Sequence, residues 1–528
     1  MDSQNQYILE DFDEQVEVLG STPVCIHWFR RDLRLRFNEI LFEAVRNANS
    51  LPMMFIYIFE TDLRGKIADH ITSMTQWNFI KNCVIDMNKK LDGNIMLLKG
   101  DPIEIFEELF THRDFYVNTL SFESNPDTHK KETDWRLRKL CIKYNVTILE
   151  TEGFTIYPFY NLAKFLEPGS DFDFEDISQK IVNIPISKPR NISLLWYKNH
   201  INFFDHLKIN LRSRILDMNK DFPSRQIDKT VNSAFIPGED EGLARFMVYR
   251  FLNKSNKKGS AKNNKKISDN LMSLSIISPY VSNGCLNIHF VFYKMMGIVK
   301  NRSIITHPLI NREYQHLISM LFPTIFANEF TLPNRYAGIR KIASETISRY
   351  FMGLTGVPYI DSVLRQLLVE GFSSSSDRDL VVRFTIGPVL NMSWEFGSKF
   401  MASTVIDLDE VVCYYNWGFY IINNRHKELE CKIPLNRQKF IKRMIPELRN
   451  MPEEYLNKPW ECPVDTQKLH GCIIGKHYPY PMAELKLLEK FCFPSTHNGN
   501  SPGVTSDETR QIEGLPQDRR EISHLYGN

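Results

Sequence analysis

The feature that most constrains this 528-residue chain is a change in hydrophobic pattern along its length. In the first part, short apolar runs of strand length alternate with stretches of helical length. The candidate strands lie at residues 24–29, 53–59, 95–98, 119–122 and 146–149. Strands that alternate with helices pair in parallel, so the pattern predicts a doubly wound α/β domain over residues 22–150.

The pattern becomes helical from about residue 239, with few strand signals up to about residue 488. We therefore expect an all-helical domain over residues 238–490. Residues 151–237, rich in Pro, Asn and Asp, are interpreted as a long connector on the surface. Residues 1–21 form an acidic N-terminal extension, and residues 491–528, which have hardly an apolar anchor, are expected to be a flexible tail.

Composition excludes several classes of protein. With 43% hydrophobic and 24% charged residues, the chain can bury two or three cores and is neither a fibre nor largely disordered. Lys and Arg number 65 against 63 Asp and Glu, so a nucleic-acid or membrane partner would need a local basic patch. The nine cysteines include no CxxC pair, which favours free thiols in a reducing compartment.

Targeting signals are also informative. The first twenty residues are acidic, unlike a secretory leader, and no run of 18 apolar residues follows. We expect a soluble protein of nucleus and cytoplasm with no membrane partner. The lysine-rich run at residues 254–266 is interpreted as a solvated loop, with a phosphate-binding or nuclear-import segment as the alternative.

One motif and a series of later blocks carry a resemblance to a known family. The apolar strand at residues 24–29 leads into WFRRDLRL at 28–35, which resembles the opening of the cryptochrome and photolyase family. Further blocks follow in the family's order: PGEDE at 237–241, ISPY at 277–280, GLTGVPYID at 353–361, SWEFG at 393–397, DLD at 407–409, FIKRMIPELR at 440–449 and GCIIGKHYP at 471–479. The later blocks are similar to the animal cryptochrome and six-four photolyase branch, and within it Cys413 and the missing histidines favour the insect light-sensing cryptochromes. The resemblance implies FAD as cofactor, no metal, and an α/β domain before a helical FAD domain.

Serine hydroxyls are the candidate donors for the FAD pyrophosphate. A buried pyrophosphate needs hydroxyl and backbone donors, best placed at a helix N-terminus. Ser273, Ser275 and Ser278 supply hydroxyls and resemble the family's phosphate clamp. The same serines would equally suit N-capping of the helix that follows. The resemblance also assigns Arg250 and Arg312 to the cofactor region.

Two carboxylates and a thiol form the candidate flavin contacts. The resemblance places Asp407 and Asp409 in the flavin region and pairs Asp407 with Arg378, since an unpaired buried charge is costly. Cys413 matches the position that faces flavin N5, where insect light-sensing cryptochromes have Cys and photolyases usually Asn. A thiol would stabilise a protonated N5 less well than an amide. Without the resemblance, the acidic residues suit a solvated helix start and Cys413 a small buried hydrophobe.

Aromatic residues form the candidate electron relay. The resemblance matches Trp417 and Trp394 to the proximal and middle tryptophans that reduce the excited flavin. The alternative is that both fill a helical core. No tryptophan stands at the distal place, near which Tyr350 lies, so the relay is either shortened or ends on this tyrosine.

Other positions depart from the family's repair enzymes. The expected Trp-His-His reads as Phe372 and serines at 373–375, and Asp379 stands where six-four photolyases carry His. Serine cannot act as a proton donor near neutral pH, so lesion repair is disfavoured. Asn311 replaces a tryptophan that could stack an extruded base, and Pro308 a glutamine that often contacts FAD.

These features favour a non-enzymatic blue-light photoreceptor of the circadian clock that signals through light-driven flavin reduction. The alternatives are a light-independent transcriptional repressor with a decaying flavin site and a DNA photolyase. The family implies clock proteins and ubiquitin-ligase components as partners, with weak or absent DNA binding. An antenna pigment is left unassigned: His27, Arg30 and Arg34 could meet a phosphate or pterin, but exposed loop charge is favoured.

Overall fold

The computed structural model describes residues 21–60, 74–124, 128–163, 174–205, 211, 215–216, 235–255, 274–296, 302–321, 344–422 and 429–493. Its N-terminal part is a parallel sheet with strand order β3-β2-β1-β4-β5, and a short strand β6 pairs with the start of β2. The strands are β1 (Thr22–Phe29), β2 (Pro52–Glu60), β3 (Ile95–Gly100), β4 (Phe115–Glu123), β5 (Thr147–Thr151) and β6 (Asn202–Phe203). The α/β prediction is therefore confirmed.

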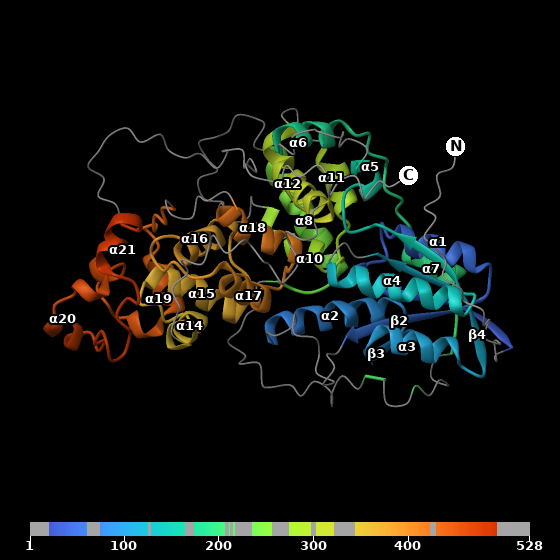
Figure 1. Ribbon diagram of the computed structural model, residues 1–528, viewed down its shortest axis with the longest axis horizontal. Helices are drawn as coiled ribbons and strands as arrows, with labels where there is room; N and C mark the ends of the chain where they lie inside the picture. Colours follow the sequence, from blue (N-terminus) through green and yellow to red (C-terminus); the bar gives the residue numbers. More distant parts are fainter. Residues whose placement is uncertain are drawn as a thin grey trace, which may run out of the picture.

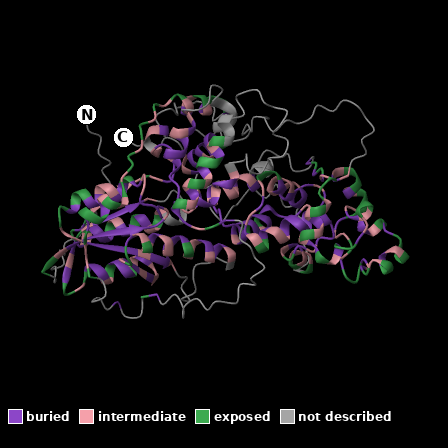
Figure 2. Cartoon of the chain, turned by 180° about the vertical axis from the view of Figure 1, so that it is seen from behind, coloured by how far each residue is buried: buried purple, intermediate pink, exposed green. Residues whose placement is uncertain are grey.

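Helices cover both faces of this sheet, which explains the continuous apolar runs. Side chains alternate along a strand, so Val24, Ile26 and Trp28 of β1 join one buried cluster and Cys25 and Phe29 another. The first cluster includes helices α3 (Pro102–Phe110) and α4 (Thr128–Lys143), and the second includes α1 (Glu39–Ala48) and α2 (Met74–Lys90). Figure 2 shows these strands as the buried centre of their layer.

The segment between the two domains contains short elements. Helices α5 (Phe159–Ala163), α6 (Phe174–Asn183) and α7 (Leu194–His200) lie here, and β6 adds its two residues to the sheet. The amphipathic α6 buries Phe174, Ile177 and Ile181. The predicted lysine-rich loop lies almost entirely outside the described residues, as do the N-terminal extension and the tail beyond residue 493.

From residue 239 on, the regular elements of the described residues are helices. In chain order its helices are α8 (Glu239–Ser255), α10 (Ser278–Ser282), α11 (Ile288–Met296), α12 (Arg302–Leu321), α14 (Ser344–Phe351), α15 (Pro358–Glu370), α16 (Ser375–Ile386), α17 (Trp394–Thr404), α18 (Glu410–Ile422), α19 (Gln438–Met444), α20 (Val464–Leu469) and α21 (Leu485–Phe491). Figure 1 shows the sheet at one end of the molecule, α19, α20 and α21 at the other, and α8, α10, α17 and α18 between them. No helix in the described ranges has the length and apolar character needed to cross a membrane.

One close approach joins the two domains. Gly284 has φ +72°, and a Cβ there would lie 1.6 Å from the carbonyl oxygen of Arg31. Arg34 Nη1 donates to the Gly284 carbonyl oxygen at 3.0 Å. The WFRRDLRL motif and the segment after α10 therefore meet where only glycine fits.

Candidate functional site

Asp407 lies at the centre of the first polar cluster of the helical domain. It stands between α17 and α18, and its carboxylate pairs with Arg378 Nη2 at 2.9 Å. Ser278 Oγ donates to Asp407 Oδ2 at 2.5 Å. Ser374 caps α16 by accepting from Asp377 N, which fixes the helix turn that carries Arg378. The predicted pairing of Asp407 with Arg378 is present in the structure.

Hydroxyl groups surround this cluster. Ser275 Oγ lies 2.8 Å from Ser375 Oγ, and Ser278 Oγ also lies 2.9 Å from the Ser275 carbonyl oxygen that accepts from it. Ser273 lies outside the described residues. Arg250 Nε and Ser373 Oγ are buried and meet no hydrogen-bond partner among the described residues.

These atoms test whether the residues fit a phosphate-bearing cofactor. A buried donor that lacks a partner costs free energy, so a ligand rich in acceptors would complete it. Ser373 precedes α16, and its carbonyl oxygen accepts from Arg378 Nε at 3.1 Å. Serine hydroxyls and arginines of this kind suit the phosphates and hydroxyls of FAD, so the donor set fits the group.

Asp409 lies at the centre of a second cluster. It accepts from Arg312 Nε at 2.9 Å, and His316 Nε2 lies 3.0 Å from the same oxygen. Burial opposes ionisation, but the charges of His316 and Arg312 outweigh it and hold the pKa of Asp409 well below its usual range. Asp409 therefore stays ionised at neutral pH. Phe154 packs against both cations, with the Arg312 guanidinium 4.3 Å from its ring centroid.

Glu313 lies next to this cluster with the opposite charge behaviour. Its side chain is fully buried, 3.6 Å from Arg312 Nη1, and accepts from Tyr157 N at 3.4 Å. Burial raises its pKa to about 7, although Arg312 and the backbone N–H groups of Ile156 and Tyr157 lower it. Two neighbouring carboxyl groups thus titrate in well-separated ranges.

Cys413 lies on the first turn of α18. Its thiol donates weakly to the Ser398 carbonyl oxygen at 3.9 Å, and its N–H donates to the Asp409 carbonyl oxygen. Burial raises the pKa of the thiol to about 12, with Arg378 opposing the shift. The residue is therefore a neutral thiol at physiological pH. On α18 it lies between the cluster of Asp409 and the aromatic residues Tyr414 and Trp417.

The two predicted tryptophans lie on adjacent helices. Trp417 of α18 is buried, and a Cβ at Gly397 of α17 would lie 2.1 Å from its ring. Trp394 begins α17 after the cap Ser393. Trp394 packs edge-to-face on Tyr414, with ring centroids 6.3 Å apart. Tyr414 precedes Trp417 by three residues, so both share one side of α18.

Tyr350 does not lie in a favourable place for the end of a relay. It is fully buried on α14, and its hydroxyl lies 2.9 Å from Thr385 Oγ1. Burial raises the pKa of Tyr350 well above its usual value. Its ring packs on Phe400 at 5.6 Å. Oxidation of a tyrosine releases a proton, and Thr385 is no base, so its assignment as relay end stays a prediction that this environment does not favour.

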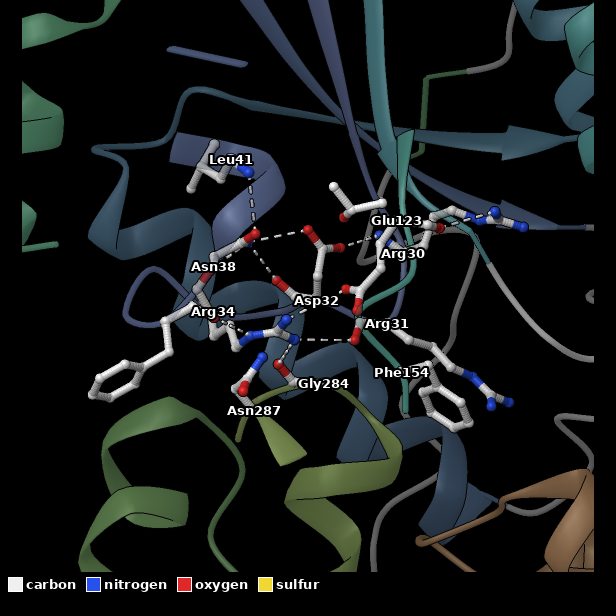
Figure 3. A network of polar contacts seen from close by, with 12 residues as sticks. Arg30, Arg31, Asp32, Arg34, Asn38, Leu41, Glu123, Phe154, Gly284 and Asn287 are labelled. Atoms are coloured by element: carbon white, nitrogen blue, oxygen red, sulfur yellow. Dashed lines mark hydrogen bonds and ion pairs between the residues drawn. The ribbon is translucent and has the colours of Figure 1, made fainter. Parts of the chain in front are cut away.

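The charges of the N-terminal motif are buried rather than exposed, which corrects the sequence-based expectation. His27, Arg30 and Arg34 are 0%, 9% and 3% exposed. Figure 3 shows the network around Asp32 and Glu123 that holds Arg30 and Arg34, and His27 Nε2 lies 3.4 Å from Asp32 Oδ2. The strand ends under the helical domain, so these side chains pair with buried carboxylates instead of reaching solvent.

The pairs in this network are internal. Arg30 Nη1 lies 2.8 Å from Asp134 Oδ1, and Arg34 Nη2 lies 3.5 Å from Glu123 Oε2. Burial raises the pKa of Glu123 to about 7, against the lowering effect of Arg34. A small cavity of about 110 Å³ lies beside the motif, between the two domains. The motif therefore joins the domains.

The positions that depart from repair enzymes carry no proton donor in the structure. Ser374, Ser375 and Ser376 form the start of α16, and Ser374 Oγ lies 2.9 Å from Ser376 Oγ. Asp379 pairs with Arg383 one turn on at 2.7 Å. Pro308 is exposed within α12.

Sequence reasoning missed three members of the site. His316 and Glu313 were not singled out, although His316 follows Arg312 by four residues on an expected helix and so shares its face. Tyr414 was also missed. Its signal was a spacing of three from Trp417, but only the packing of α17 on α18 shows which neighbouring ring it meets.

Comparison with family models covers both domains. The model described as DNA photolyase matches residues 25–167, and the model described as FAD binding domain of DNA photolyase matches residues 305–494. The second match contains the carboxylates of the two clusters with their cations, Cys413, and the aromatic residues of α17 and α18.

Curated relatives and solved structures agree with these matches. Cryptochrome-1 of Spalax judaei is 24% identical over 487 residues, covering 87% of this chain and 79% of the relative. Cryptochrome-2 of Gallus gallus is 25% identical over 488 residues, covering 87% and 80%. Among solved structures, a Synechocystis cryptochrome gives a TM-score of 0.68 at 20% identity, covering 89% of this chain and 99% of that one. An Agrobacterium tumefaciens class III photolyase gives 0.70 at 20%, covering 91% and 98%. At this identity the structures show the fold alone.

Proposed function

Because the chain belongs to the photolyase and cryptochrome family and carries its FAD-binding domain, we propose that it is a blue-light photoreceptor. In this proposal it resembles insect light-sensing cryptochromes, acts in circadian signalling and catalyses no reaction on a substrate. When bound, FAD supplies the chromophore and the electron acceptor.

One observation carries the proposal. Cys413, Tyr414 and Trp417 lie on α18, and Trp394 of the adjacent helix packs on Tyr414. The neutral thiol of Cys413 lies at one end of this set, beside the acidic cluster of Asp409. Trp417 and Trp394 are buried and Tyr414 packs on Trp394, so oxidisable rings of two adjacent helices are placed to pass an electron toward the cofactor region.

The end of this relay follows from the two tyrosines. Tyr350 is fully buried with its hydroxyl against Thr385. Tyr414 is only partly buried, so its phenolic proton can pass to water when the ring gives up an electron. We therefore assign Tyr414 as the terminal electron donor. It gives an electron to oxidised Trp394 or to oxidised Trp417.

Lesion repair is the rival activity, favoured by the fold likeness to a photolyase. Repair of six-four lesions needs a proton donor at the mouth of the site. This chain has serines at 373–375 and an Asp379 that pairs with Arg383. These residues support a signalling role over repair. A scaffold role as a light-independent repressor is the second alternative, favoured by the exposed Pro308 where a flavin contact was expected.

Partners and location follow the same proposal. A circadian photoreceptor of this kind would act in nucleus and cytoplasm, with clock proteins and ubiquitin-ligase components as partners and little affinity for DNA.

Repair and signalling are separated by one paired experiment. The purified protein is mixed with UV-irradiated and undamaged duplex DNA, illuminated with blue light, and assayed for both lesion loss and bleaching of the oxidised flavin spectrum. We expect bleaching with no lesion loss and no preference for damaged DNA. Light-dependent lesion loss would refute the signalling proposal in favour of a photolyase.

A further inference from the structure

Two cysteine thiols meet at the far end of the helical domain. Cys431 and Cys492 are 0% and 1% exposed, and their side chains are in hydrogen-bond contact. Main-chain bonds hold the two segments together, from Cys431 N to the Phe491 carbonyl oxygen at 2.9 Å and from Ile433 N to that of Cys492 at 3.1 Å. The two cysteines therefore lie side by side on neighbouring stretches of backbone.

This spacing suits a covalent bond between them. The main-chain hydrogen bonds join residue 431 to residue 491 and residue 433 to residue 492, so they keep the backbone of Cys431 next to that of Cys492. A disulfide needs Cα atoms roughly 4.4 to 6.8 Å apart. The hydrogen bonds that flank the pair therefore favour a bond between these two cysteines.

The position of the pair gives the bond a structural consequence. Residues 431 and 492 bracket a unit with its own buried cluster, which includes Ile441, Leu448 and Tyr478. Cys431 follows the helix α18 along the chain, and Cys492 ends α21. A bond between them would close a covalent loop around this unit. It would also attach α21 to the segment that follows α18.

Access to the thiols depends on α21. This helix has seven residues, of which Leu488 is the only fully buried one, so few buried contacts hold it in place. The contact with Cys431 and burial raise the pKa of Cys492, so the closed pair stays in the thiol form. The thiols therefore react with an oxidant when α21 detaches from the domain and exposes them to water.

We propose that Cys431 and Cys492 form an oxidative modification site that takes a low-molecular-weight disulfide such as oxidised glutathione. In the first step the thiolate of one cysteine attacks a glutathione sulfur, forming a mixed disulfide and releasing one glutathione thiol. In the second step the other cysteine displaces the second glutathione. One protein disulfide and two reduced glutathiones result, so electrons and protons balance. This site is independent of the proposed photoreceptor function.

A second thiol pair offers an internal control. Cys83 of α2 contacts Cys285, and both are 1% exposed. The helix α2 has 17 residues and lies between the sheet and the helical domain. Because its release would open the interface between the domains, we expect this pair to stay reduced in the folded protein.

The test uses the full chain in buffers of fixed reduced to oxidised glutathione ratio, followed by alkylation and peptide mapping without reductant. Trypsin separates the pair, since Lys432 follows Cys431 and Lys490 lies before Cys492. We expect a cross-linked peptide of Cys431 and Cys492, and a melting temperature that rises by a few degrees on oxidation. Both effects should vanish in Cys492→Ser and persist in Cys141→Ser, a buried cysteine outside either pair.

Several results would overturn the proposal. They are a folded, oxidised protein without this cross-link, a stable glutathione adduct in its place, or a cross-link that appears only after denaturation. If Cys492→Ser fails to fold, Cys431→Ala provides the same comparison.

Discussion

The buried carboxyl of Glu313 predicts a measurable loss of stability as pH rises. Its side chain is fully buried, and burial raises its pKa from 4.5 to about 7. Between these values the folded protein keeps a proton that the unfolded chain has released, so the free energy of unfolding falls as pH rises through this window. The difference between the unfolded and folded pKa of Glu313 corresponds to about 3 kcal/mol of the free energy of unfolding. This contribution is present below pH 4.5 and lost above pH 7.

The perturbation is Glu313→Gln, which keeps the shape and the acceptor for Tyr157 N but removes the titration. Unfolding free energies from urea titrations are compared for both proteins at about pH 4.5 and about pH 8. From the lower to the higher pH, we expect the free energy of unfolding of the variant to rise by about 3 kcal/mol relative to that of the parent. Glu484→Gln, at an exposed position, should show no such gain. If the difference in free energy of unfolding between the Glu313 variant and its parent were the same at both pH values, the assigned pKa shift of Glu313 would be refuted.

Three further changes test the site. Gly397→Ala forces a methyl into the ring of Trp417, so we expect a loss of about 1–3 kcal/mol in urea unfolding and slower photoreduction. Arg378→Leu leaves the buried Asp407 without its cation, which should cost about 3–5 kcal/mol and much of the bound flavin, as measured by unfolding and by cofactor extraction. Tyr414→Phe keeps the packing but removes the phenolic proton, so the initial rate of photoreduction should drop several-fold in steady blue light.

Matched controls separate these effects from general damage. Tyr350→Phe should leave photoreduction unchanged, and the opposite ranking of the two tyrosines would contradict the assigned relay end. Arg383→Leu removes a partly exposed cation that pairs with Asp379, so it should cost under about 1 kcal/mol. Equal losses for the two arginine variants would contradict the role of Asp407.

The α/β domain was predictable because β1 to β4 contain short apolar runs, and runs buried on both faces stand out in a sequence. Strand β6 was not, since its two residues carry no periodicity and depend on pairing with Pro52 and Met53. The buried network of the WFRRDLRL motif was misjudged for a related reason. Charged residues after a strand usually reach solvent, and only the docking of the helical domain at Gly284 shows that these do not.

Within the site, the pairing of Asp407 with Arg378 was foreseen because a buried carboxylate needs a cation. His316, the partner of Asp409, was missed. It shares a helix face with Arg312, but helical spacing alone does not show that its ring reaches Asp409. The place of Tyr414 depends on how α17 packs on α18, a tertiary contact between residues twenty positions apart. Local pattern cannot report such a contact.

The most direct test of the account is an absorption spectrum of the purified protein in darkness and after blue light, with the released cofactor quantified. The account predicts stoichiometric FAD whose oxidised spectrum bleaches in blue light, with bleaching lost in Trp417→Phe. A folded, monodisperse protein without flavin, or one whose flavin does not respond to light, would contradict it.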